Sequence, residues 1–202
     1  SGKSTVLLGL IEADMDAGRS VVVLDPSSER PVGFNPLVSD GRSPELVADG
    51  IFATLHELFA SHWGPRTSDV LSSSLLTLAR TPGSSLPLLP MLLTNPAYRQ
   101  RLTKNIDDPL GAGGFWRWFE ALSDAERAVV VAPALSRLRQ LLLRPSLRAV
   151  LGQSAPAFDM AEVFKRPRIV LVRLSPGQLG PEGAALFGSL VWSRLWQLIQ
   201  AQ

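Results

Sequence analysis

The sequence predicts an α/β fold in which a parallel sheet is interrupted by a long all-α stretch. Three observations lead to this prediction. The chain opens on the second half of a phosphate-binding loop, which an apolar helix and a strand at residues 20–25 follow. From Ser43 the apolar residues then recur at helical spacing for over a hundred residues. A second apolar strand at residues 169–174 returns the chain to α/β character.

The first five residues, Ser1-Gly2-Lys3-Ser4-Thr5, match the end of the pattern G-x-x-x-x-G-K-[ST]. In a complete loop, backbone N–H groups and the start of the next helix surround the phosphates. Lys3 would reach the β- and γ-phosphates of ATP, and the Ser4 hydroxyl would bind Mg²⁺. Because the first glycine and the preceding strand are absent, we interpret the chain as a fragment that begins inside a nucleotide site. The alternative is a chance G-K-S-T sequence in a surface turn.

The residues after this loop favour the phosphate-binding interpretation. Residues 6–11 are apolar, Gly18 ends the expected helix, and the strand at residues 20–25 follows at once. Loop end, helix, short turn and buried strand make up the second half of a βαβ unit. Asp25 at the strand end resembles a Mg²⁺-binding Walker B aspartate, but in ATPases that strand comes much later. We therefore expect Asp25 to tether the following loop, with Mg²⁺ binding near the nucleotide as the alternative.

Residues 26–42 are rich in Pro, Gly and Ser and are predicted to be a connector. Residues 43–151 are predicted to be all helical, because Ser43 is a cap before a proline at the first helical position. Ser123 and Glu126 form a capping box, and Pro133 is expected to kink or interrupt the helix that follows. The predicted helical segments are residues 43–63, 67–80, 86–93, 95–102, 124–143 and 145–151, with a glycine-rich loop at 111–114.

The last part of the chain is predicted to return to α/β structure. A short helical turn at residues 158–164 precedes the strand at 169–174, which is apolar enough to be central in a parallel sheet. A turn at 175–180 then leads into a long helix from Pro181 that continues to the last residue. The predicted units are therefore a first core piece at 1–42, an inserted all-α subdomain at 43–151 and a second core piece at 152–202.

The charge is unevenly distributed. Residues 1–79 carry five basic and ten acidic side chains, whereas residues 80–148 carry ten basic and five acidic ones. A basic helical region is typical of contact with nucleic acid, and the alternative is a set of solvated helix faces. The absence of cysteine excludes disulfides and cysteine-based zinc sites, and suits a reducing compartment.

Aromatic and histidine residues allow two interpretations each. Arg117 lies between Trp116 and Trp118, which suits stacking on nucleic-acid bases. Large aromatic residues at helical spacing more often form a core, and we favour that interpretation. His56 and His62 have no partner at metal-ligand spacing, so we expect each to be a packing or surface residue.

Taken in order, these segments resemble the conjugative-transfer ATPases of the HerA–FtsK P-loop group, including the TraG/TraD-like coupling proteins of type IV secretion. The resemblance rests on G-K-S-T, V-V-V-L-D-P, F-N-P-L, the helical stretch, R-I-V-L-V-R-L-S-P-G-Q-L-G and a helix with L-F-G-S-L-V-W. It covers nearly the whole chain. The Walker B strand of the family would come next, so the resemblance implies truncation at both ends.

The resemblance implies a RecA-like motor domain that binds ATP and Mg²⁺ and assembles into a homo-hexamer. It implies translocation of DNA or relaxase-linked DNA, contact with secretion-channel proteins, and a cytoplasmic location at the inner face of the membrane through other parts of the parent. Ser1, Gly2, Lys3, Ser4 and Thr5 match the nucleotide-binding residues of the family, with Lys3 in the catalytic role. The alternatives are a helical partner-docking module without activity and another P-loop enzyme such as a small kinase.

Overall fold

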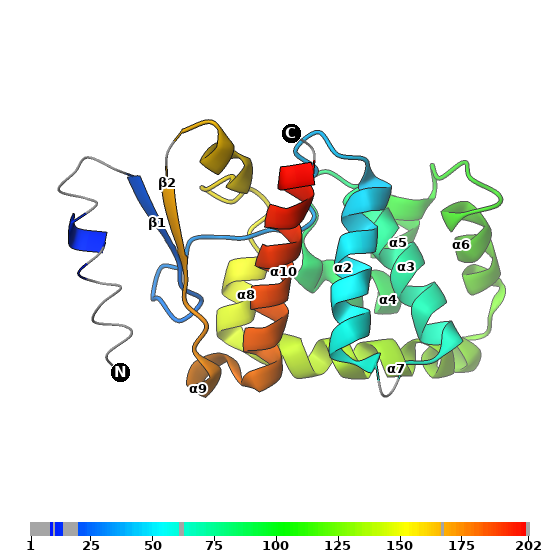
Figure 1. The fold of residues 1–202 in the computed structure, drawn as a ribbon. Helices are drawn as coiled ribbons and strands as arrows, with labels where there is room; N and C mark the ends of the chain where they lie inside the picture. Colours follow the sequence, from blue (N-terminus) through cyan, green and yellow to red (C-terminus); the bar gives the residue numbers. More distant parts are fainter. Residues whose placement is uncertain (1–8, 10, 14–19, 61–62, 167, 201–202) are drawn as a thin grey trace.

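The computed structural model describes residues 9, 11–13, 20–60, 63–166 and 168–200 (Figure 1). The predicted nucleotide-binding residues Ser1, Gly2, Lys3, Ser4 and Thr5, together with His62, lie outside the described residues. The described chain is mostly helical. Its two strands lie at one end of the molecule, and the helices extend from them to the other end (Figure 1).

Two short parallel strands form the sheet. Strand β1 spans Ser20–Leu24 and strand β2 spans Arg168–Val172, with Ser20 opposite Arg168 and Leu24 opposite Val172. Both strands are rich in β-branched residues, which suit extended backbone. Every residue of β2 is only partly buried, and Val23 of β1 is 42% exposed. Neither strand is therefore enclosed on both faces within the described part of the chain.

The helices begin where local signals place them. Ser43 caps α2, Asn95 caps α5, and Ser123 with Glu126 forms the predicted capping box of α7. Proline occupies the first turn of several helices, where its missing N–H costs nothing. The helical elements are α2 (Pro44–Leu58), α3 (Pro65–Ala79), the 3-10 helix η2 (Leu86–Leu88), α4 (Leu89–Thr94), α5 (Pro96–Thr103), α6 (Ala112–Ala121), α7 (Asp124–Leu142), α8 (Pro145–Leu151), the 3-10 helix η3 (Met160–Phe164), α9 (Pro176–Leu179) and α10 (Pro181–Gln200).

Helix α10 joins the sheet end of the molecule to the helical body. It packs against α2, which in turn packs against α3 (Figure 1). The segment before α2 adds polar contacts to this packing, because Asp40 pairs with buried Arg194 of α10 and Arg42 donates to Gln197. Burial lowers the pKa of Arg42 to about 10. Buried apolar side chains from Leu24 to Leu198 form one continuous cluster.

The connector at residues 26–42 crosses the helical body and is fixed there. The Phe34 amide donates to the carbonyl of Val150 in α8, and the Phe34 ring packs edge-on against Phe187 of α10 at 5.9 Å between centroids. The Asn35 side chain donates to the carbonyl of Ser84 at 2.8 Å. The connector therefore forms part of the core that α10 closes.

The prediction of a RecA-like P-loop NTPase sheet with a large all-α insertion was wrong. The described residues form a mostly helical molecule with a two-stranded parallel sheet. The predicted strands exist and pair in parallel, but the apolar residues around them pack between helices instead of covering a wide sheet. The division at residues 42 and 151 stays a prediction.

One prediction about a single segment was also wrong, and a second was wrong in part. The glycine-rich stretch at 111–114 was expected to be a loop, but α6 begins at Ala112. Pro133 was expected to kink or interrupt its helix; α7 continues on both sides of it, so the interruption was wrong, while the kink stays a prediction. Within the described residues, no helix combines the length and the apolar character that crossing a membrane requires.

Candidate functional site

The carboxyl ends of β1 and β2 meet at one edge of the sheet, and this edge carries paired charges. Asp25 follows β1 and Arg173 follows β2. The Arg173 Nη1 lies 3.0 Å from Asp25 Oδ2, and the Arg173 amide donates to the Leu24 carbonyl at 2.9 Å. Because ligands of open α/β sheets bind beyond the carboxyl ends of the strands, this edge is the candidate functional site.

Asp25 also holds the start of the connector. Its Oδ1 accepts hydrogen bonds from the Ser27 amide at 2.9 Å and from the Ser27 hydroxyl at 2.5 Å. The loop-tethering role predicted for Asp25 is therefore confirmed, while Mg²⁺ binding stays a prediction. Burial raises the pKa of Asp25, but the hydrogen bonds from Ser27 and the interaction with Arg173 together outweigh it, so the pKa lies below its ordinary value. Asp25 is therefore charged at neutral pH.

Arg173 was not predicted as a site residue, and it is the exposed member of this pair. Its side chain is about two-thirds exposed, whereas that of Asp25 is mostly buried. An exposed guanidinium beside a fixed carboxylate remains free to turn toward an anion at the same edge. The signal was the position alone, since Arg173 directly follows the second predicted strand.

The aromatic residues at 115–119 form a core cluster, as predicted. Phe115, Trp116 and Phe119 are buried against one another, and the Trp116 Nε1 donates to the Thr77 hydroxyl of α3 at 2.8 Å. Trp118 stays partly exposed. His56 packs against the rings of Phe52 and Trp63, which confirms its packing role. The described residues contain no group of three metal-binding side chains.

The basic residues of the middle region do not form one solvated face. Arg99 of α5 is only 2% exposed, and its Nε lies 2.6 Å from Glu120 Oε1 of α6. Arg127 of α7 shares Glu120 at 2.9 Å and also pairs with Asp124 at 2.8 Å. Arg80 pairs with Glu45 at 2.9 Å. Part of the positive charge is therefore neutralised by ion pairs, and that of Arg99 is neutralised inside the helical body, which no local pattern in the sequence indicates.

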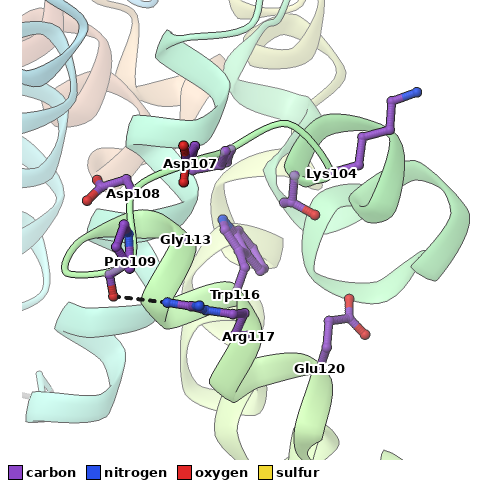
Figure 2. Close-up of a pocket in the computed structure, with 10 residues that line it drawn as sticks. Lys104, Asp107, Asp108, Pro109, Gly113, Trp116, Arg117 and Glu120 are labelled. Carbon is purple, nitrogen blue, oxygen red and sulfur yellow. Dashed lines mark hydrogen bonds between the residues drawn. The ribbon is translucent and has the colours of Figure 1, made fainter.

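A cavity of about 440 Å³ lies between the segment after α5 and helix α6 (Figure 2). It is lined by the basic residues Lys104 and Arg117 and by the acidic residues Asp107, Asp108 and Glu120. Figure 2 shows the Arg117 side chain turned to the Pro109 carbonyl, to which it donates at 3.3 Å. Because the charges are of both signs and Arg117 is already bonded, this cavity indicates no single class of ligand.

Comparisons of the chain with protein-family models, with curated proteins and with solved structures gave no match.

Proposed function

We propose that this chain belongs to a motor ATPase that binds ATP and Mg²⁺ through residues 1–5 and uses hydrolysis to move DNA. The observation that supports the proposal is the charged carboxyl edge of the parallel pair β1 and β2. Residues 1–5 precede β1 by the stretch in which the sequence predicts a helix. A helix that connects to a following parallel strand begins beside the edge of the sheet where that strand ends. The phosphates would then lie near Asp25 and Arg173.

The proposed chemistry is positioning and charge neutralisation, as in phosphoryl transfer generally. Gly2 lets the backbone approach the phosphates, Lys3 neutralises the β- and γ-phosphates, and the Ser4 hydroxyl takes a place on Mg²⁺. Asp25 would hold the connector in place, and the exposed Arg173 would face the nucleotide.

Replacing Lys3 by alanine in the full-length parent tests this proposal. Without the ammonium group the phosphates lose their main cationic partner, so we expect ATP turnover to fall by about a thousandfold or more. Turnover is measured by phosphate release with and without DNA. Lys165→Ala, at an exposed position directly after η3 and outside the basic region, is the matched control and should leave turnover unchanged. An unchanged rate in Lys3→Ala would contradict the nucleotide assignment.

A helical partner-docking module is the second candidate. It is favoured by one face of α10, where Trp192 is 64% exposed, Trp196 is 51% exposed and Ile199 is also exposed. Exposed tryptophans one helical turn apart are typical of protein interfaces. This candidate predicts no ATP turnover in the unmodified parent, so the phosphate-release measurement separates it from the motor.

A further inference from the structure

A second cavity lies between α4–α5 and α7, and Arg99 and Arg127 of the Glu120 ion-pair network contribute to its lining. Its volume is about 530 Å³, within the range of small-molecule sites. Three arginines, Arg99, Arg127 and Arg139, contribute to its lining. Most of the remaining wall is apolar and includes Leu93, Val131 and Leu135. This combination suits a ligand with an apolar body and an anionic group.

Arg99 supplies a fixed donor at this cavity. Its Nε is bound by Glu120, its Nη1 donates to the carbonyls of Leu93 and Leu92 at 3.2 and 3.4 Å, and its guanidinium lies 5.0 Å from the centre of the Phe119 ring. Its Nη2 makes no hydrogen bond within the described part of the chain. A guanidinium held on two sides loses little conformational entropy when its remaining donors bind a ligand.

Helix α7 presents the complementary half of the cavity. Arg127, Val131, Leu135 and Arg139 recur every four residues, so they lie along one face of the helix. Arg127 is bound to Glu120, which is partly buried, and to Asp124, whose side chain is 99% exposed. Since an exposed ion pair is worth little, a ligand anion can replace Asp124 at Arg127.

The charge of the site limits the ligand further. Arg99, Arg127, Arg139 and Asp124 line the cavity, and Glu120 pairs with Arg99 and Arg127 from outside the lining. Three positive and two negative charges leave one net positive charge. A singly charged group matches this balance better than a phosphate dianion. We propose that this cavity binds an apolar carboxylate, whose head contacts Arg99 and Arg127 and whose tail lies along Val131 and Leu135. Such a carboxylate is either a free amphipathic acid or the carboxyl end of an apolar peptide. The site is independent of the proposed nucleotide site.

Octanoate and its uncharged analogue octanol test the proposal on the whole chain. We expect octanoate to bind with saturable calorimetric heats, and octanol to bind at least about tenfold more weakly, because it cannot pair with the arginines. An N-acetylated apolar tetrapeptide with a free carboxyl end, and its C-terminal amide, form the second arm. Binding of octanoate identifies a free acid as ligand, and binding of the peptide acid alone identifies a chain end. If neither binds, or if octanol matches octanoate, the proposal is overturned.

Three variants locate the binding without depending on the buried Arg99. Arg127→Gln should lower the affinity for the carboxylate that the native chain binds by about tenfold to a hundredfold. Asp124→Asn should strengthen binding, because it removes the carboxylate that competes for Arg127. If Arg127 had only a structural role, removing its Asp124 partner would not raise the affinity for the ligand. Arg101→Gln, outside the cavity, should leave binding unchanged. Equal affinity in the native chain and in Arg127→Gln would place the ligand elsewhere and overturn the proposal.

Discussion

Arg99 connects four helices through one buried guanidinium. It lies on α5, donates to the last carbonyls of α4, and pairs with Glu120 of α6, which also binds Arg127 of α7. A buried charge is stable only when its partners are in place, because its hydration is lost on folding. The network therefore fixes the mutual positions of these helices, and it also forms one wall of the apolar-anionic cavity.

Replacing Arg99 by methionine should lower the free energy of unfolding by about 3 kcal/mol. Methionine fills much of the space, but the α4 carbonyls and Glu120 lose their charged donor. The measurement is urea unfolding followed by circular dichroism. Arg101→Met is the control, since Arg101 is exposed and lies over the Tyr98 ring, and it should change stability by less than about 0.5 kcal/mol. Equal effects of the two substitutions would show that the Arg99 network adds no stability.

At the residue scale, contacts between partners that are close in the chain could be predicted from the sequence. The tether between Asp25 and Ser27 spans two residues and was predicted, whereas the pair of Asp25 with Arg173 spans 148 residues and was not. Arg99 was counted with the exposed basic residues for the same reason. Its burial depends on Glu120, which is 21 residues away on another helix.

At the scale of elements, the start of α6 shows what glycine does inside a helix. A Cβ atom at Gly113 would lie 2.7 Å from the carbonyl oxygen of Asp108, and one at Gly114 would lie 2.5 Å from that of Pro109. The amides of Gly111 and Gly114 donate to the Asp108 carbonyl. The glycines therefore allow the preceding segment to pack directly on the first turn of α6.

Gly113→Ala should destabilise the chain by about 1–3 kcal/mol, because the added methyl group collides with backbone that is itself hydrogen-bonded. The thermal midpoint of unfolding measures this effect. Gly177→Ala is the matched control: it lies in the first turn of α9, and its added Cβ would contact nothing within 4 Å. That variant should be neutral or more stable by up to about 1 kcal/mol. A fall in the midpoint for both variants would contradict the steric explanation.

Most helices could be predicted because their signals are local. Caps such as Ser43, Asn95 and Ser123 act on residues of the same turn, so reading the sequence placed these helix starts within a few residues. The prediction of a loop at residues 111–114 was wrong because the glycines there do not form a turn. They allow the preceding segment to approach the first turn of α6 closely. The extent of the sheet could not be predicted, since an apolar run does not specify how many strands lie beside it.

At the scale of the whole molecule, α10 connects the sheet end to the helical body. Its inner face buries Phe187 against Phe34 of the connector, and its outer face exposes Trp192 and Trp196. The two faces carry side chains of similar size and chemistry with opposite exposure. Burial, and not residue type, should therefore decide how much each contributes to stability.

Phe187→Ala should lower the free energy of unfolding by about 3–5 kcal/mol, because it leaves a cavity where the connector, α8 and α10 meet. Trp192→Ala removes a larger ring from the exposed face and should lower the free energy by less than about 1 kcal/mol. Chemical unfolding of both variants gives the comparison. A larger loss for Trp192→Ala would mean that the outer face of α10 is covered in solution.

The pairing of β1 with β2 also has a consequence for the order in which the chain folds. Strand β1 can pair with β2 only after the whole helical body has been synthesised, because the helices lie between the two strands in the chain. The residues of the Asp25–Arg173 contact are 148 positions apart. Closing so long a loop carries a large entropic cost, whereas helices such as α2 and α3 find their partners nearby in the chain. We therefore expect the helical body to form early in folding and the charged edge of the sheet to form last.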